Sequence, residues 1–85
     1  MTKTATLYRM KLLGHECPYG LRARALLEQA GYEIDEHLLT SRAQVDAYLE
    51  QEGVDTTPQV FIDGRRIGDS EELERYLERE SADGV

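Results

Sequence analysis

The chain has 85 residues, 17 of them acidic and 10 basic, and a net charge of −7. This length predicts one small domain with a modest core, and the negative charge disfavours nucleic acid and anionic membranes as partners. A single cysteine excludes an internal disulfide framework. No stretch has the pattern of a signal peptide or the roughly 20 apolar residues of a membrane span, so we expect a reducing, cytoplasmic location.

A strand, a loop and a helix are expected first. Residues 5–10 (ATLYRM) are apolar and β-prone and predict the strand, while residues 11–16 predict a connecting loop that turns at Gly14. From Pro18 onwards the pattern changes, because apolar residues recur at i, i+3, i+4 and i+7. This spacing predicts an amphipathic helix that stops at Gly31.

A second strand and a second helix follow after a very short connection. Residues 32–39 (YEIDEHLL) return to alternation and predict the strand. Ser41 opens the next helix, with Gln44 at the spacing of a capping box. Gly53 is expected to end this helix.

The last third of the chain predicts a β-hairpin and a helix. Residues 59–63 (QVFID) contain a consecutive apolar run, so this strand should be covered on both faces. Residues 63–64 form a two-residue hairpin signal, and residues 66–68 would be the return strand. The last helix starts near 69–70 and frays into a tail over 81–85.

The element order is therefore β-α-β-α-β-β-α, without repeats or linkers, so residues 1–85 predict a single α/β domain. A right-handed crossover pairs the first two strands in parallel, and the hairpin adds an antiparallel fourth strand. We expect a four-stranded mixed sheet with helices on both faces. Cys17 then lies just past the end of the first strand, where open α/β sheets bind ligands.

Cys17 holds the only thiol and falls where the first helix begins. Pro18 suits the first helical position, which puts Cys17 at or beside the N-cap. There the free N–H groups and the helix dipole favour the thiolate, which is the form that attacks sulfur. The alternative is a buried small hydrophobe, but the flanking residues 14–16 and 19–20 favour a loop and some exposure.

Three stretches, in this order and spacing, make the chain similar to a glutaredoxin of the thioredoxin fold in its single-cysteine form. They are Cys17-Pro18-Tyr19, residues 56–64 (TTPQVFIDG) and residues 67–73 (IGDSEEL), and the match covers nearly the whole chain. The resemblance implies that Pro58 is cis and lies against the cysteine. The residues alone favour an ordinary turn proline, since only about 5% of X-Pro bonds are cis.

The resemblance also implies a glutathione site, with glutathione as co-substrate. The backbone of Thr57, just before Pro58, would pair with the extended tripeptide. The N–H groups of Ser70 and Glu71 would bind the γ-glutamyl carboxylate, although helix capping is the simpler role for both residues. The Glu71 carboxylate would receive the ammonium group, and Tyr19 would cover the thiol.

The glycine carboxylate of glutathione needs a cation. The candidates are Lys11, Arg22 and Arg42, of which Lys11 is preferred, in a loop longer than the usual family connection. His15 could support the Cys17 thiolate. These two residues are too few ligands for zinc, so no metal site is predicted from the protein's side chains alone.

Two departures from the family pattern shape the expected mechanism. Gly20 stands where a dithiol glutaredoxin has its second cysteine, so Cys17 should act alone, through a mixed disulfide with glutathione. The expected partners are glutathionylated proteins or small disulfides. Asp69 replaces the second glycine of the family's Gly-Gly pair, which puts a negative charge near the γ-glutamyl end of glutathione.

Two other functions remain open for this pattern. A single-cysteine glutaredoxin can carry a [2Fe-2S] cluster as a homodimer, with Cys17 and one glutathione from each side as ligands. Such carriers usually show Cys-Gly-Phe-Ser, whereas Pro18 and Tyr19 resemble the catalytic version, for which a monomer is expected. The third possibility is a glutathione-binding module without catalysis.

Overall fold

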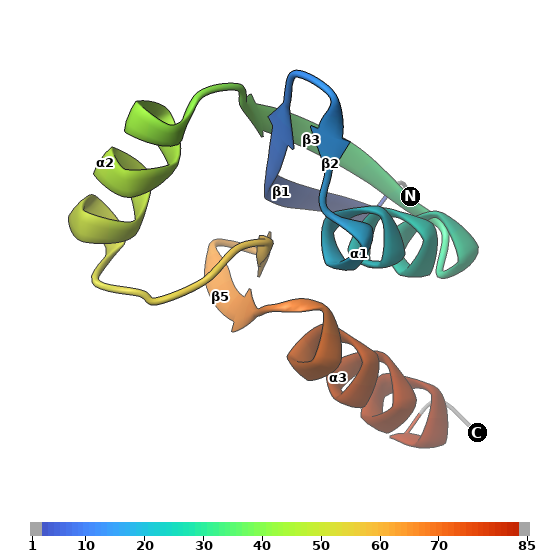
Figure 1. The fold of residues 1–85 in the computed structure, drawn as a ribbon. Coiled ribbons are helices and arrows are strands. Elements are labelled where there is room, and N and C mark those ends of the chain that lie inside the picture. Colours follow the sequence, from blue (N-terminus) through green and yellow to red (C-terminus); the bar gives the residue numbers. More distant parts are fainter. Residues whose placement is uncertain (1–2, 84–85) are drawn as a thin grey trace.

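A mixed β-sheet lies between helices in the computed structural model, which describes residues 3–83 (Figure 1). The elements in chain order are β1 (Lys3–Leu12), β2 (His15–Glu16), α1 (Pro18–Gln29), β3 (Tyr32–Leu39), α2 (Arg42–Glu52), β4 (Gln59–Ile62), β5 (Arg65–Gly68) and α3 (Ser70–Asp83). No helix of these described residues is long and apolar enough to cross a membrane.

Strand β1 holds the sheet together. It pairs in parallel with β3, in a register that runs from Lys3 opposite Tyr32 to Met10 opposite Leu39. Its other neighbour is β4, which runs antiparallel and in turn pairs antiparallel with β5. The order β3-β1-β4-β5 confirms the predicted mixed sheet of four strands, to which the short strand β2 adds a fifth beside β1.

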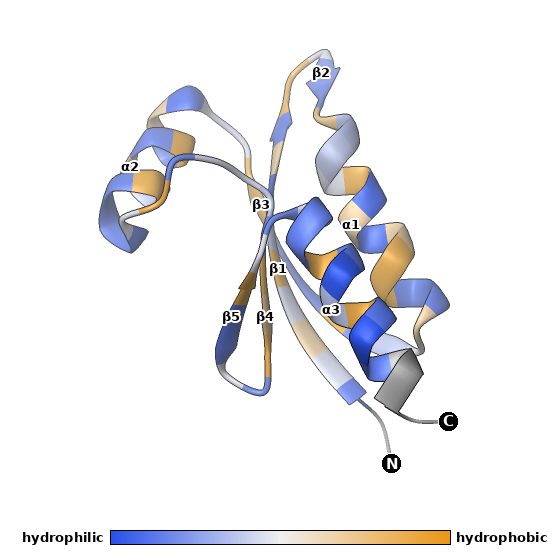
Figure 2. Cartoon of the chain, turned by 90° about the horizontal axis from the view of Figure 1, so that it is seen from below, coloured by the Kyte–Doolittle hydropathy of each residue, from blue (hydrophilic) through white to orange (hydrophobic). Residues whose placement is uncertain are grey.

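Helices cover both faces of the sheet, as the sequence predicts. Figure 2 shows α1 and α3 together on one side of the sheet and α2 on the other. The larger core lies on the side of α1 and α3, because alternate side chains of β1 point there. Its buried members are Ala5, Leu7, Ala23, Leu27, Val60, Ile62 and Leu73.

An aromatic cluster fills the space under α2. The ring of Tyr8 stacks on His37 and on Tyr48, with ring centroids 4.6 and 4.7 Å apart, and meets Phe61 edge-on. Burial raises the pKa of Tyr48 to about 12. Because Phe61 faces this cluster while its neighbours in β4 face the larger core, the consecutive apolar run is covered on both faces, as predicted.

The predicted helix boundaries are confirmed where turn residues mark them. The hydroxyl of Ser41 accepts a hydrogen bond from the Gln44 N–H at 3.2 Å, and Gly53 ends α2 in the left-handed conformation. Gly31 also has a positive φ, of 84°, directly after α1. Helix α3 continues past the start of the predicted tail to Asp83, and the last two residues of that tail lie outside the described residues.

The loop predicted over residues 11–16 is wrong. Strand β1 continues to Leu12 and then folds back on itself as β2, so that Lys11 lies opposite Glu16. Gly14, with φ of 74°, is in the turn, as predicted. A strand of two exposed residues has no apolar pattern from which it could be predicted. An ion pair of Glu16 helps to hold this strand in place.

Arg9 provides that ion pair from the middle of β1. Its side chain is only 3% exposed, with Nη1 2.7 Å from Glu16 Oε1 and Nε 2.6 Å from Glu36 Oε2. Burial acts to lower the pKa of Arg9, but the hydrogen bonds to Glu36 and Glu16 outweigh it and the pKa is raised. One guanidinium thus ties β2 and β3 to β1.

Replacement of Glu16 by Gln tests this tie through its pH dependence. The hydrogen bond from Arg9 lowers the pKa of Glu16 below its ordinary 4.5. A group with a lowered folded-state pKa adds stability above its unfolded pKa and loses it as the pH falls through the folded value. Glu16→Gln should therefore be less stable than the wild type at about pH 7, and this difference should shrink at about pH 3. Urea unfolding at both pH values measures it, and an unchanged difference would contradict the ion pair.

Candidate functional site

The thiol of Cys17 lies at the N-cap of α1, in extended backbone with φ −68° and ψ 123°. The Cys17 carbonyl accepts hydrogen bonds from the N–H groups of Gly20 and Leu21. The residue is half-buried, which argues against the alternative of a fully buried hydrophobe. No acidic residue occupies the first turn of α1, so no carboxylate there competes with the sulfur for the positive end of the helix.

A groove of about 260 Å³ brings together five of the residues predicted to bind glutathione. It is lined by Tyr19 of α1, by Thr56, Thr57 and Pro58 before β4, and by Asp69, Ser70 and Glu71 around the start of α3. The Thr57–Pro58 bond is cis, as the resemblance implies, and Pro58 is fully buried. Cys17 does not line the groove itself, but Tyr19, two residues further along the chain, does.

The segment before β4 is held by two residues that the sequence analysis did not single out. Gln59 is buried, and its side-chain Nε2 donates to the Thr56 carbonyl at 2.9 Å. The Thr56 hydroxyl donates to the Thr57 carbonyl at 3.1 Å. These bonds hold the irregular segment that leads into β4 at Gln59. The signal for Gln59 was available, because a polar side chain that opens a buried strand needs a partner.

The start of α3 satisfies part of its own N-terminus. Asp69 Oδ1 accepts from the Glu72 N–H at 3.0 Å, and Glu72 Oε1 accepts from the Asp69 N–H at 3.4 Å, which is a reciprocal capping box. The N–H groups of Ser70 and Glu71 remain for a ligand carboxylate. The charged side chains of the groove lining, Asp69 and Glu71, are both acidic, so the groove favours an ammonium group over a second carboxylate.

The cations proposed for the glycine carboxylate do not line this groove. Lys11 belongs to the β1–β2 hairpin and is exposed, and Arg42 is the first residue of α2. Arg22 forms an ion pair with Glu74 of α3. The preference for Lys11 placed this residue in a long connecting loop, whereas the structure places it in strand β1.

Gly20 also has a packing role, at the contact between α1 and β1. It is buried in the first turn of α1, and a Cβ there would lie 3.1 Å from the Arg9 Cβ and 3.4 Å from the Arg9 Cδ. Glycine therefore lets the start of α1 approach β1 closely. Arg9 was not recognised as a site residue because a single charge within an apolar strand does not show its partners.

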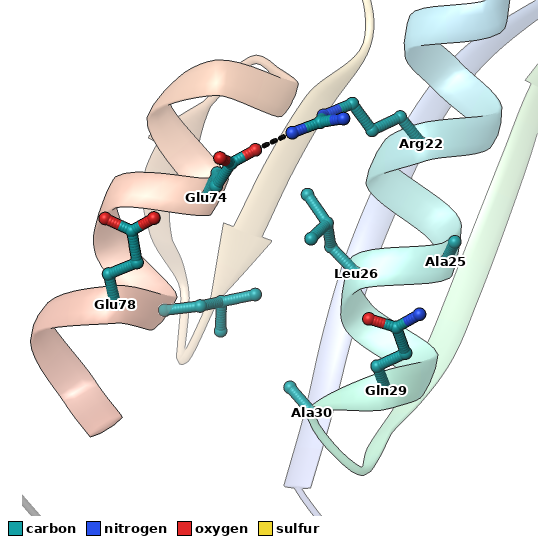
Figure 3. Close-up of a pocket in the computed structure, with 8 residues that line it drawn as sticks. Arg22, Ala25, Leu26, Gln29, Ala30, Glu74 and Glu78 are labelled. Carbon is teal, nitrogen blue, oxygen red and sulfur yellow. Dashed lines mark hydrogen bonds and ion pairs between the residues drawn. The ribbon is translucent and has the colours of Figure 1, made fainter. Parts of the chain in front are cut away.

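A larger hollow, of about 680 Å³, lies between α1 and α3 and does not include the thiol (Figure 3). Leu26, Ala25 and Ala30 line it from α1, and the Arg22–Glu74 ion pair spans one end. It contains none of the side chains that the glutathione hypothesis uses, apart from Arg22.

Comparisons with known proteins agree on one family. The model of the Glutaredoxin family matches residues 5–67. Hybrid peroxiredoxin hyPrx5 of Haemophilus influenzae is 38% identical over 61 residues, which cover 72% of this chain and 25% of that protein. Glutaredoxin 3 of Escherichia coli K12 is 36% identical over 58 residues, covering 67% and 70%. The chain thus spans about a quarter of the length of hyPrx5 and a larger share of glutaredoxin 3.

Solved structures show the same fold. Glutaredoxin 1 of Francisella tularensis, complexed with cacodylate, has a TM-score of 0.80 at 23% identity, covering 92% of this chain and 95% of that one. The buckwheat glutaredoxin–glutathione complex has a TM-score of 0.67 at 25% identity, covering 89% and 70%. The thioredoxin-like fold expected from the resemblance is confirmed.

Replacement of Gly20 by Ala tests the close approach of α1 to β1. Overpacking costs about 1–3 kcal/mol, and the helix propensity of Ala returns about 1, so we expect a net loss of about 1 kcal/mol in urea unfolding. The shift of the helix start should also change the rate at which iodoacetamide alkylates Cys17.

Gly53→Ala is the matched control for this variant. Gly53 has open space around it and a φ of 68°, so an alanine there costs stability through backbone conformation and not through contact. This variant should leave the alkylation rate unchanged. If both variants changed the alkylation rate in proportion to their stability loss, Gly20 would have no special place at the thiol.

Proposed function

The chain belongs to the glutaredoxin family, and we propose that it is a glutathione-dependent thiol-disulfide oxidoreductase that removes glutathione from mixed disulfides by a monothiol mechanism. The observation that carries this proposal is the groove itself: it joins the residue next to Cys17-Pro18, the backbone at Thr57 and the start of α3. Membership of the family supports a thiol-oxidoreductase role in general.

The proposed reaction has two exchange steps. The Cys17 thiolate attacks the glutathione sulfur of a glutathionylated substrate, which forms Cys17-S-S-glutathione and releases the substrate thiolate, which takes up a proton. A second glutathione, as thiolate, then attacks the glutathione sulfur of this mixed disulfide. Oxidised glutathione leaves and the Cys17 thiolate returns. One free glutathione thiol is consumed for each mixed disulfide reduced, because the other half of the oxidised glutathione comes from the substrate, and a reducing compartment such as the cytoplasm would supply that thiol.

The residues around the groove have separate tasks in this proposal. The backbone of Thr57 pairs with the extended tripeptide, in the manner of an added strand. The N–H groups of Ser70 and Glu71 bind the γ-glutamyl carboxylate at the positive end of α3, and the Glu71 carboxylate receives the neighbouring ammonium group. Tyr19, which is 63% exposed, closes the thiol end of the groove. The glutathione complex of the buckwheat protein supports this use of the fold.

The proposed mechanism needs external glutathione because the chain has a single cysteine. The sequence has one Cys, so Cys17 has no partner for an internal disulfide. The [2Fe-2S] hypothesis requires four thiolates, of which one chain would supply only one. No observation of the described residues favours that hypothesis over exchange, and it stays a prediction to be tested by a visible absorption band and a glutathione-dependent dimer.

Replacement of Cys17 by Ser tests the proposed function directly. The wild type should turn over the mixed disulfide of glutathione and 2-mercaptoethanol in an assay coupled to glutathione reductase. Cys17→Ser should lose this turnover completely, because serine cannot form the mixed disulfide, while its circular dichroism stays that of the wild type. A folded wild type without turnover would leave only the binding module or the cluster carrier.

Replacement of Asp69 by Asn tests the effect of charge in the groove. Asn caps a helix about as well as Asp, so the stability should change by less than about 0.5 kcal/mol. Removal of the negative charge should lower the KM for glutathione severalfold, because the ligand carboxylate no longer faces it. Asp69→Ala is the control for the cap, with an expected loss of about 1 kcal/mol. An unchanged KM in Asp69→Asn would place the γ-glutamyl group elsewhere.

A further inference from the structure

The hairpin between β1 and β2 carries a fully exposed leucine close to the thiol. Leu13, in its turn, has a relative exposure of 103%, so its side chain packs against nothing in the described chain. The large exposed apolar side chains among residues 3–83 are Leu13, Tyr19, Leu21 and Leu38, and the first three lie within four residues of Cys17. Turns favour Gly, Asn, Asp and Ser, so local folding does not account for a leucine at this position.

The hairpin is held rigidly beside Cys17. Two residue pairs join β2 to β1, and the Glu16 carboxylate is 2.7 Å from the buried Arg9 guanidinium. Leu13 is four residues before Cys17, which at the rise of a strand is a separation of at most about 13 Å. Figure 1 shows the hairpin projecting past the start of α1. Leu13 is therefore held at the tip of a fixed hairpin, four residues before the reactive Cys17.

We propose that the Leu13 hairpin is a docking element for protein substrates and inserts into an apolar site within about 13 Å of the substrate cysteine. This inference rests on the proposed exchange reaction at Cys17. The groove lining does not include the hairpin, so a glutathione in the groove leaves Leu13 uncovered. A protein that brings its disulfide to Cys17 is far larger than the groove and therefore also contacts the surface around Cys17, which includes the Leu13 hairpin. Burial of Leu13 then favours protein partners over small disulfides.

The charge of the chain favours a protein over a membrane as the partner. A lone apolar side chain on an anionic bilayer gains little without basic residues around it. The chain has a net charge of −7, and the hairpin itself contains both Lys11 and Glu16. Because the Leu13 hairpin is close to Cys17 along the chain, the partner that covers it is the protein whose disulfide reacts with Cys17.

Two glutathionylated peptides and one small disulfide test the proposal. The peptides have ten residues and equal charge, and differ only in leucine or serine three and four residues from the cysteine, a distance of about 10–14 Å. The wild type should have a KM about tenfold lower for the leucine peptide, which corresponds to about 1.4 kcal/mol. Leu13→Ser should abolish this preference and leave kcat/KM for the glutathione–2-mercaptoethanol disulfide unchanged.

Two matched variants control for a general effect of the substitution. Leu13→Met keeps an apolar side chain and should keep the preference for the leucine peptide. Leu38→Ser removes an exposed leucine of β3, outside the hairpin, and should also keep it. Loss of the preference in Leu38→Ser, or its persistence in Leu13→Ser, would overturn the proposal. So would an equal loss of activity toward the small disulfide, which would place Leu13 at the thiol itself.

A binding measurement separates this inference from the proposed function. If the wild type turned over none of the three disulfides, the proposed function would fail. Fluorescence anisotropy with the labelled peptides and Cys17→Ser, with and without Leu13→Ser, then decides the docking role. The leucine peptide should bind about tenfold more tightly only when Leu13 is present. Equal binding would overturn the proposal, as would Leu13-dependent sedimentation with vesicles containing phosphatidylserine.

Discussion

The buried guanidinium of Arg9 constrains the position of the thiol through its ion pair with Glu16, the residue before Cys17. A charge that is only 3% exposed in the central strand is tolerated because Glu16 and Glu36 satisfy it from two sides. Loss of such partners costs several kcal/mol per buried ion in general, so β1, β2 and β3 can be assembled only in the register that brings these carboxylates to Arg9. Glu16 directly precedes Cys17. The ion pair that neutralises the buried Arg9 charge therefore also fixes the residue just before the N-cap of α1.

The two helix N-termini at the groove are used in opposite ways. The first turn of α1 has no acidic residue, and a thiol stands at its N-cap without a side-chain hydrogen bond. The first turn of α3 contains Glu71 and Glu72, and Asp69 caps it. The dipole of α1 is therefore available to a negative sulfur, whereas that of α3 is partly neutralised by its own chain. A zwitterionic ligand suits this arrangement, since its ammonium group can meet the carboxylates while its carboxylate meets the remaining N–H groups.

Features that follow from a local pattern of residues could be predicted from the sequence, whereas features that depend on ion pairs between residues far apart in the chain could not. The strand over Tyr32–Leu39 and the helix stops at Gly31 and Gly53 follow from apolar periodicity and turn chemistry, which are local. The resemblance, and not the residues alone, supplied the cis Pro58 and the residues of the groove. Arg9 and the short strand β2 could not be found in this way, because their stability comes from ion pairs between residues 7 and 27 positions apart.

The monothiol character of the chain is a property of its packing as well as of its composition. A Cβ at position 20 would lie 3.1 Å from the Cβ of Arg9, closer than side-chain carbons normally pack. Arg9 has little room to move, since β1 is paired on one edge with β3 and on the other with β4, and its guanidinium is held by two carboxylates. A cysteine side chain at this position would press on Arg9, so the close contact between α1 and the central strand favours glycine there.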